Sequence, residues 1–595
     1  MAIDPGFAET AFSFAPGDSA MSGFSGTVLS LPSLPPGVSP IDKTVIDVDA
    51  PSLSVFDLST LGGAPQGRAV SPAVKLSIKA KDIGQVFPLA FDTGEDGGPP
   101  NLYAAATSAY GLQIMSSKPD ADGSPVRLKV GGPDAQFMKG QFGGLPGGDA
   151  GTIWKIDGGT GAVTALADTA LSGVANSGPG IGGLAYDPVS HMLYASDLDT
   201  GLIHRFALDH NAADLDQFDH GVTGRPSRAL LPVPDDGKRA DITNASFKVD
   251  DPSTWGFTQS ARRVRALAVH NSRLYYSVDE GPEIWSVGLN QDGSFGTDPR
   301  SELLAKGDSA SPVTNIAFDA QGRMLLAQRG AQKGAYDYGA FVDAAPTQVL
   351  RYTVENPDNP ATPGIWSPTP DSYAAGFASG GKAASGGLSL QYGYRPDGTL
   401  DANACQGTIA LTADGITEDG NGHGAQLNAV DLVLPANLPP KQSAFIDFNI
   451  RQDAANFTGH AGDVKSYQPC AAGAGFPPVA GGAGGGFPPL GGAGGFPPVG
   501  GAGGFPPVGG AGGFPPIAGG GGSALPPIQG GGGETAPPVE GGGTTQTPPE
   551  PDTPTVQDGS IKLTKVGVSP GCNEQKACTY KVTVQNTSAA PVPGP

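Results

Sequence analysis

Short apolar runs alternate with polar turns through the middle of the chain, and one arrangement of such runs recurs four times between residues 87 and 352. Each copy has an apolar-Ala-apolar-Asp or -His run, a second run centred on two large side chains, and a third run ending in an apolar or aromatic residue. The copies are Leu89–Asp92, Leu102–Tyr103 and Ile153–Ile156; Leu184–Asp187, Leu193–Tyr194 and Ile203–Phe206; Leu267–His270, Leu274–Tyr275 and Ile284–Val287; and Ile316–Asp319, Met324–Leu325 and Val349–Tyr352. Such runs with turn residues between them predict short antiparallel strands.

Strand sets of this kind cannot bury an apolar face alone, so neighbouring copies must pack against one another. The repeats therefore predict an all-β fold, with a β-propeller over residues 71–470. Two weaker copies follow, at Gly387–Leu390 with Thr408–Leu411 and at Leu427–Leu432 with Phe445–Phe448. Six countable starts favour six blades, and the long intervals between some starts leave seven open.

The segments before and after this region differ in composition. Residues 1–70 are rich in Ser, Pro and Gly, which predicts an extended N-terminal arm that can add a strand. Val74–Lys79 alternates apolar and polar residues, as a strand that closes the ring would. Residues 471–558 repeat Phe-Pro-Pro-Val-Gly-Gly-Ala-Gly-Gly and predict a linker without secondary structure, because Gly and Pro-Pro disfavour both helix and sheet. A docking motif for an aromatic groove is the alternative.

The last segment, residues 559–595, contains two alternating runs, Ser560–Val566 and Tyr580–Thr587. Together they resemble the start of the Ig-like repeat modules of bacterial surface proteins. A complete sandwich of that type needs about 100 residues. We therefore expect a truncated Ig-like module, and either a sequence that is a fragment of a longer protein or a last segment that is only partly folded.

Charge and cysteines restrict the environment and the partners. A net charge of −22 without a basic stripe argues against nucleic-acid binding, and no run of about 18 apolar residues predicts a transmembrane segment. Cys405 and Cys470 bracket the end of the predicted propeller, and Cys572 and Cys578 are six positions apart. We predict both pairs as disulfides; metal ligation is the alternative. Disulfides favour an extracellular, cell-surface or periplasmic location, although the sequence shows no signal peptide.

Candidate metal ligands are few. The carboxylates of Asp120, Asp122, Asp292 and Asp419 lie in Asp/Gly turns and are candidates for a structural calcium, but none belongs to a complete twelve-residue calcium loop. Turns of this composition are most often ordinary hairpin turns. His204, His210 and His220 lie among aspartates, which suggests either a His/Asp metal site or an acidic surface insertion. No motif identifies catalytic residues, and none firmly implies a cofactor.

The pattern of Leu89–Asp92 with Leu102–Tyr103 resembles six-bladed propellers of the gluconolactonase and NHL-repeat type. In the gluconolactonase group a divalent metal in the axial channel is held by Glu, Asn and Asp from several blades. The resemblance implies the fold, and no motif carries those ligands over to this sequence.

Three functions are compatible with this organisation. The first is a non-catalytic bacterial protein that is exported to the cell surface or secreted. Its propeller would bind an unknown protein or glycan ligand, the Gly/Pro-rich segment would act as a spacer, and sequence beyond residue 595 would attach it to the surface. The second is a metal-dependent propeller hydrolase or lactonase. The third is a matrix protein that self-associates through its Phe-Pro-Pro repeats. Convergent carboxylates at the propeller axis would favour the enzyme, and a plugged axis would favour the binding protein.

Overall fold

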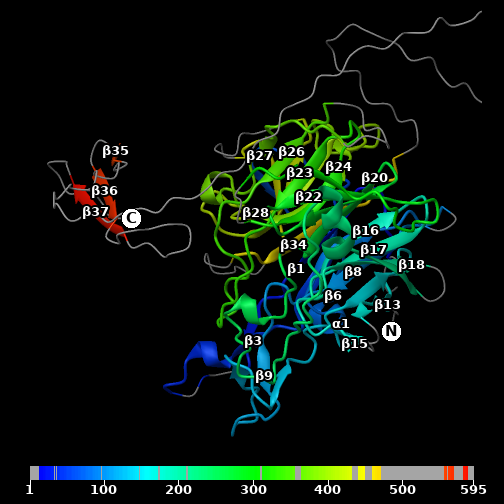
Figure 1. Cartoon of the computed structure of the whole chain (residues 1–595). Coiled ribbons are helices and arrows are strands. Elements are labelled where there is room, and N and C mark those ends of the chain that lie inside the picture. The colour runs from blue at the N-terminus through cyan, green and yellow to red at the C-terminus, as the bar shows by residue number, and fades with distance from the viewer. Residues whose placement is uncertain are drawn as a thin grey trace, which may run out of the picture. The chain divides into compact units, whose positions relative to one another are not determined.

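The computed structural model describes most of the first 470 residues and three strands near the C-terminus (Figure 1). The described residues are 12–31, 34, 36–94, 97–145, 148–171, 174–208, 212–307, 311–355, 364–431, 440–448, 458–470, 555–558, 561–567 and 580–586. The chain divides into two compact units, Met1–Gly485 and Gly486–Pro595. Each unit is described by itself.

Six sheets of four or five strands form the blades in the described part of the first unit. We number them along the chain. Blade 1 is β7 (Val86–Phe91), β8 (Leu102–Ala106), β12 (Thr152–Ile156) and β13 (Val163–Asp168). Blade 2 is β16 (Ile181–Asp187), β17 (Met192–Asp197), β18 (Leu202–Ala207) and β19 (Asp214–Asp219). Blade 3 is β20 (Val264–His270), β21 (Arg273–Val278), β22 (Glu283–Gly288) and β23 (Arg300–Leu304).

The remaining blades draw on both ends of the unit. Blade 4 is β24 (Val313–Phe318), β25 (Met324–Gln328), β26 (Val349–Tyr352) and β27 (Asp371–Tyr373). Blade 5 is β28 (Ala384–Gln391), β31 (Thr408–Asp414), β32 (His423–Ala429) and β33 (Ala444–Asp447), to which β5 (Arg68–Val70) adds in parallel. Blade 6 is β34 (Ala461–Ser466), β1 (Asp18–Gly23), β4 (Pro51–Asp57) and β6 (Val74–Lys79).

The blades form a ring because each packs on both of its neighbours. The first strands β7, β16, β20, β24, β28 and β34 pack against one another in this order, and β34 packs against β7. A buried apolar cluster fills each of the six junctions between consecutive blades. Alternation along a strand directs one set of side chains to each neighbouring blade, which is why the first three strands of each blade are mostly buried. The outermost strands, such as β6, β13, β19 and β23, are mostly half-buried or exposed. The prediction of an all-β propeller is confirmed.

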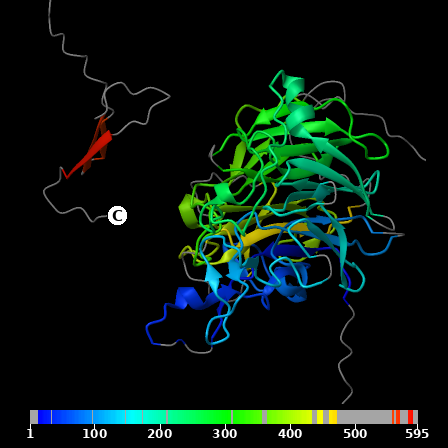
Figure 2. The same cartoon turned by 60° about the horizontal axis from the view of Figure 1, so that its bottom comes forward.

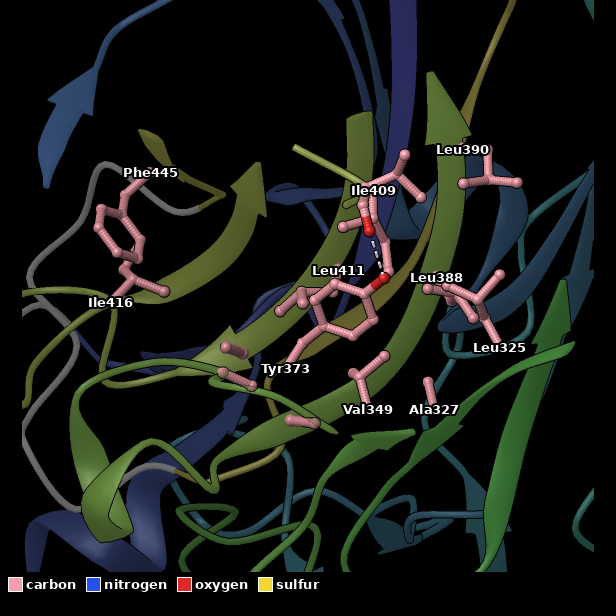
Figure 3. Close-up of a cluster of buried hydrophobic side chains, with 14 residues drawn as sticks. Leu325, Ala327, Val349, Tyr373, Leu388, Leu390, Ile409, Leu411, Ile416 and Phe445 are labelled. Carbon is pink, nitrogen blue, oxygen red and sulfur yellow. Dashed lines mark hydrogen bonds between the residues drawn. The ribbon is translucent and has the colours of Figure 1, made fainter. Parts of the chain in front are cut away.

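The junction of blades 4 and 5 shows how this packing works (Figure 3). Leu325 and Val349 of blade 4 lie against Leu388 and Leu411 of blade 5 in one buried cluster. Tyr373, on the last strand of blade 4, places its ring in the same cluster and donates a hydrogen bond of 2.6 Å from its hydroxyl to a backbone carbonyl of blade 5. The polar end of the ring is thus satisfied while its apolar body is buried.

The ring closes by pairing the two ends of the propeller sequence. Strand β34 pairs antiparallel with β1, with Ser466 opposite Ser19 and Val464 opposite Met21. Figures 1 and 2 both show the yellow β34 beside the dark blue β1. The expected strand Val74–Lys79 is confirmed as β6, the strand of blade 6 farthest from β34.

Two expectations need correction here. Residues 18–57 are not an extended arm: β1 and β4 are buried strands of blade 6, because β34 alone could not complete a blade. The weak copy at 427–448 is not a sixth blade either. It supplies β32 and β33 of blade 5, since both pair within that sheet. The number six is correct, but the sixth blade is assembled from both ends of the domain.

The predicted bond between Cys405 and Cys470 is confirmed, with the two Cα atoms 5.9 Å apart. It links the loop before β31 to the end of β34, and so connects blade 5 to the closing strand. Cys572 and Cys578 lie outside the described residues, so the second predicted disulfide stays a prediction.

Long insertions lie at one edge of the blades. This is the edge where the first strand of each blade begins and the second strand of each blade ends, and we call it the insertion face. The hairpin β2 (Thr27–Leu29) and β3 (Thr44–Ile46) follows β1, and the small sheet of β9 (Ile114–Ser116), β10 (Arg127–Leu128) and β11 (Ala135–Phe137) follows β8. Residues 329–348 follow β25, and residues 220–263 precede β20. In Figure 1, β3 and β9 lie together on one side of the blades.

The second unit contains three described strands, β35 (Thr555–Asp558), β36 (Ile561–Gly567) and β37 (Tyr580–Asn586), in one antiparallel sheet. Both alternating runs expected after residue 558 are strands. The Phe-Pro-Pro repeats lie outside the described residues. Among the helices that the structure describes, none combines the length and the apolar character that crossing a bilayer requires.

Candidate functional site

At the centre of the ring a buried ion pair joins the first strands of several blades. Asp463 on β34 is 2 % exposed, and its Oδ1 accepts a hydrogen bond of 2.7 Å from Nδ2 of Asn315 on β24. Its Oδ2 accepts a backbone bond of 3.1 Å from Leu89 on β7. The Lys465 ammonium lies 3.3 Å from Oδ2 of Asp463 and donates to Oδ1 of Asn315 at 3.1 Å and to the carbonyl of Leu388 at 2.9 Å. The cluster therefore ties four blades together at the axis.

These residues do not fit the axial metal that the gluconolactonase resemblance implies. A divalent cation needs several oxygen ligands with free lone pairs. Here the Lys465 ammonium already bridges the carboxylate of Asp463 and the amide oxygen of Asn315, which are the oxygens that a metal would use. Within the described ranges, no three His, Cys, Asp or Glu side chains are grouped to hold a metal. Burial raises the pKa of Asp463, and the adjacent Lys465 opposes that rise.

On the insertion face the axis is covered by stacked aromatic rings. Phe24 and Phe341 stack with their centroids 4.4 Å apart, in a buried cluster that includes Phe87 and Tyr110. Below them the fully buried guanidinium of Arg329 lies 4.1 Å from the centroid of Tyr110 and donates to the carbonyls of Ser385 and Ala461 at the starts of two first strands. The axis is thus plugged at this end.

A polar cavity of about 250 Å³ lies off the axis, between blades 1 and 2 on the insertion face. Its polar lining consists of Thr169, Asn176, Asp197, Asp199, Thr200 and Arg239. Asp197 holds Asn176 and Thr200 in place. Its Oδ1 accepts a hydrogen bond of 2.8 Å from the Asn176 amide, and its Oδ2 accepts one of 2.6 Å from the Thr200 hydroxyl. We call this cavity the acidic cavity.

The carboxyl group of Asp199 is the part of this lining that has unused bonding capacity. Asp199 is 2 % exposed, and its Oδ1 accepts no hydrogen bond from any described residue. Its Oδ2 has only long contacts, 3.4 Å to the backbone nitrogen of Ser177 and 3.8 Å to Nε of Arg239. Burial, and then the charge of Asp197, raise the pKa of Asp199 to about 7. Near neutral pH this carboxyl can therefore accept a hydrogen bond or donate one.

The two described histidines of the predicted cluster, His204 and His220, have different partners. His204 donates from Nδ1 to Oδ2 of Asp214 at 2.8 Å, and its Nε2 lies 3.9 Å from Asp197. Burial favours the neutral ring, but the neighbouring carboxylates of Asp197 and Asp214 outweigh it and raise the pKa of His204 to about 9. His220 packs instead against Tyr276 and Trp285, and burial lowers its pKa to about 3. A protonated His204 is a counterion for Asp197 and not a metal ligand.

His210, the third member of that cluster, lies outside the described residues. The alternative, an acidic surface insertion, also differs from what is observed, because His204 and His220 are buried.

The four aspartates proposed for calcium lie in three separate turns, and three of them, Asp120, Asp292 and Asp419, stabilise their own turns. Oδ1 of Asp120 accepts from the backbone nitrogens of Asp122 and Ser124 at 2.9 Å, and its other oxygen pairs with Lys43. Asp292, between β22 and β23, accepts from Ser294, and Asp419, between β31 and β32, accepts from Asn421. Calcium binding at these turns stays a prediction.

Sequence reasoning missed both Lys465 and Asp199. Lys465 is on β34, which has no Leu-Ala-Phe-Asp motif. Asp199 follows the second strand of the second copy, in the segment Asp197-Leu-Asp-Thr-Gly. The sequence did contain a signal for Asp199. Acidic residues directly after the Leu-Tyr strand are predicted to lie on the insertion face, because the second strand of each blade ends there.

Comparisons with known proteins give fold-level similarity only. No protein-family model matches the chain, and no curated protein matches it. Solved structures that match include one of a nidogen/laminin complex, at 12 % identity and a TM-score of 0.31, covering 76 % of this chain and 98 % of the other. A β-propeller domain from Myceliophteria thermophila matches at 11 % identity and a TM-score of 0.25, covering 58 % and 82 %. A luciferin-regenerating enzyme matches at 10 % identity and a TM-score of 0.28, covering 60 % and 96 %. Similarity at this level does not identify an activity.

Proposed function

We propose that this chain is a non-catalytic binding protein, exported to the bacterial surface or secreted, whose propeller binds its ligand in the acidic cavity. The observation that supports this most is the contrast between the axis and the cavity. At the axis the carboxylate of Asp463 is neutralised by Lys465, whereas the carboxyl of Asp199 keeps an oxygen without a partner among the described residues. A site with unfilled capacity can bind a ligand without breaking an existing pair.

The ligand that suits this cavity carries hydrogen-bond donors. Asp199 offers an acceptor, the ordered Asn176 and Thr200 offer polar contacts, and the volume of about 250 Å³ suits one small polar unit. One sugar residue of a glycan has this chemistry, with several hydroxyl donors. A hydroxyl-bearing or amine-bearing side chain of a protein partner has it as well.

Binding of the purified full-length chain to a glycan array tests this proposal. Asp199→Asn should weaken binding of the best glycan about tenfold or more, because it removes a charged acceptor. Asp122→Asn, an exposed aspartate in the insertion of blade 1, makes the same charge change elsewhere and should leave binding unchanged. Equal affinity of Asp199→Asn and the wild type for every bound glycan and protein partner would contradict the assignment of the cavity.

A hydrolase or lactonase is the second candidate, and one observation favours it. A carboxyl group with a pKa of about 7 in a cavity is suited to general acid or base catalysis near neutral pH. Turnover of a lactone panel, with and without divalent metal and chelator, separates the two functions. Turnover by the wild type that is lost in Asp199→Asn would contradict the non-catalytic binding function and would indicate catalysis in the acidic cavity. Chelator-sensitive turnover lost on substituting Asp463 would overturn the account of the axis.

The remaining parts of the proposal concern presentation. We propose that residues 471–558 act as a spacer and that β35, β36 and β37 begin an Ig-like module of the kind found on bacterial surfaces. The antiparallel pairing of β36 with β37, with Leu563 opposite Val584, supports the module. Surface protease treatment of cells that express the natural full-length protein tests it. Release of the propeller from intact cells is expected, and protection until lysis would contradict export.

A further inference from the structure

A second cavity on the insertion face lies between two insertions from different blades. Residues 110–113 and Arg127 come from the insertion of blade 1, and Tyr336, Tyr338 and Phe341 come from the insertion of blade 4. Its volume of about 20 Å³ admits one small chemical group. We call it the donor cavity. It shares no lining residue with the acidic cavity.

Three buried hydrogen-bond donors in this lining have no acceptor among the described residues. They are Nε2 of Gln113, Nη2 of Arg127 and the hydroxyl of Tyr338. The three residues are only 6 %, 6 % and 4 % exposed, respectively. More than nine in ten buried polar groups find a partner, and a buried donor left without one costs about 1–3 kcal/mol. Three such atoms around one cavity therefore indicate a missing acceptor.

The neighbouring structure fixes two of these donors. The other amide atom of Gln113, Oε1, accepts a hydrogen bond of 2.8 Å from the backbone nitrogen of Ile46. This contact fixes the orientation of the amide, and Nε2 remains without an acceptor among the described residues. Nη1 of Arg127 donates to the carbonyls of Ile41 and Thr44 at 2.9 and 2.5 Å, which leaves Nη2 over. Both donors are therefore held before a ligand arrives, which lowers the entropy cost of binding.

Tyr338 is held by its backbone and its ring. Its φ of 61° is in the left-handed region, which a bulky residue rarely adopts. The ring packs edge-on against Phe341 with the centroids 4.4 Å apart. Unfavourable backbone geometry of this kind is found preferentially at functional sites. The third donor is thus fixed as firmly as the other two.

The charge at the cavity selects an anion. The guanidinium of Arg127 lies 4.1 Å from the centroid of Tyr336, and the exposed Lys129 ammonium lies 4.4 Å from the same centroid. Two carboxylates lie near Arg127. Asp42 accepts a hydrogen bond of 3.1 Å from the Tyr336 hydroxyl, and Asp337 accepts one of 3.0 Å from the backbone nitrogen of Gly339. An Arg, an amide N–H and a phenol O–H around a space for one small group match a carboxylate. The half-buried ring of Tyr336 beside it suits a ring attached to that carboxylate, whereas the ring of Phe341 is buried against Phe24 and Tyr338.

We propose that the donor cavity binds the carboxylate of a ring-bearing acid, with Gln113, Arg127 and Tyr338 as donors. This site goes beyond the proposed function. The donor cavity would bind a negatively charged hydrogen-bond acceptor of a ligand, whereas the acidic cavity would bind a hydrogen-bond donor. The acid can be an aromatic carboxylate or the uronic-acid unit of a glycan, and the chemistry of recognition is the same for both.

Calorimetric titration of the full-length chain with benzoate and with glucuronate distinguishes the two sources. Neutral benzamide and glucose are the matched controls. One acid should bind at least tenfold more tightly than its neutral analogue. Arg127→Gln should weaken that binding about tenfold to a hundredfold, because it removes the charged donor. Arg395→Gln, at a half-exposed arginine in the turn between β29 (Gly393–Tyr394) and β30 (Leu400–Asp401), should leave it unchanged.

Tyr338→Phe keeps the ring and provides a test that does not depend on the folding of the arginine variant. It should weaken acid binding at least threefold and should not lower the melting temperature of the free protein, because the hydroxyl has no partner among the described residues. Equal binding of each acid and its neutral analogue would overturn the proposal. So would unchanged acid binding in Tyr338→Phe, or a high-resolution structure in which a water satisfies all three donors in the presence of saturating acid.

Discussion

The propeller axis and the two insertion-face cavities all contain buried charged groups, but the bonding of these groups differs. At the axis the carboxylate of Asp463 and the ammonium of Lys465 satisfy each other and their neighbours. In the cavities Asp199 keeps an acceptor atom without a partner, and Arg127 keeps a donor atom without one, among the described residues. The residue types alone would favour the axis as the functional site. The remaining bonding capacity instead assigns stability to the Asp463–Lys465 pair and binding to the cavities, although Nε of Arg329 at the axis also has no partner among the described residues.

The largest effect should come from breaking the satisfied pair. Lys465→Met leaves the buried carboxylate of Asp463 without its counterion and should destabilise the fold by about 3–5 kcal/mol in denaturant unfolding. Burial already raises the pKa of Asp463, so the folded state binds a proton more readily than the unfolded state. The stability lost in the variant should therefore be smaller at pH 4 than at pH 7. A loss below 1 kcal/mol would show that the axis is not a satisfied pair.

Removing the disulfide that supports ring closure should have the next largest effect. Replacing Cys405 and Cys470 with serine should cost about 2–5 kcal/mol, because the unfolded chain gains freedom. The matched measurement is unfolding of the wild type under reducing conditions. Equal stability of the oxidised wild type and the double serine variant would indicate that closure depends on β1–β34 pairing alone.

Replacing Asp199, whose Oδ1 has no partner among the described residues, should stabilise the free protein where Lys465→Met destabilises it. Because the folded-state pKa of Asp199 is about 7 and its unfolded value is about 3.9, the group's contribution to stability is full below pH 3.9 and is lost as the pH rises through 7. Asp199→Asn should therefore stabilise the free protein by about 1 kcal/mol at pH 8 and have little effect at pH 4, measured by denaturant unfolding. A destabilisation above 1 kcal/mol at pH 8 would indicate that Asp199 has a partner.

Ligand binding should separate the two cavities by pH. Binding of a donor-bearing ligand in the acidic cavity should weaken between pH 8 and pH 6, because Asp199 loses its charge around pH 7. Asp168→Asn, at an exposed aspartate at the end of β13, is the control that should retain this profile. Carboxylate binding in the donor cavity should change less than threefold over the same interval, since Arg127 keeps its charge. Identical pH profiles at both cavities would remove the distinction between them.

The sequence predicted the parts of this molecule that local pattern determines. Four blades were readable because each has its apolar alternation and turns within one continuous segment, as in Leu184–Asp187 and its partners. Blade 6 was not, because β34 and β1 are separated by more than 400 residues and β34, with Asp463 and Lys465, lacks the apolar-Ala-apolar run of the first strands of blades 1 to 4. The cavities were also hidden, since Gln113 and Tyr338 come from insertions with no repeat. Cys405 and Cys470 were predictable because few cysteines left few pairings.

Diffraction at the manganese absorption edge from crystals soaked in Mn²⁺ tests the central claim most directly. The account predicts no anomalous peak at the axis, with the Lys465 ammonium within hydrogen-bond distance of Asn315. A manganese ion bound by Asp463 and Asn315, with Lys465 displaced, would contradict it.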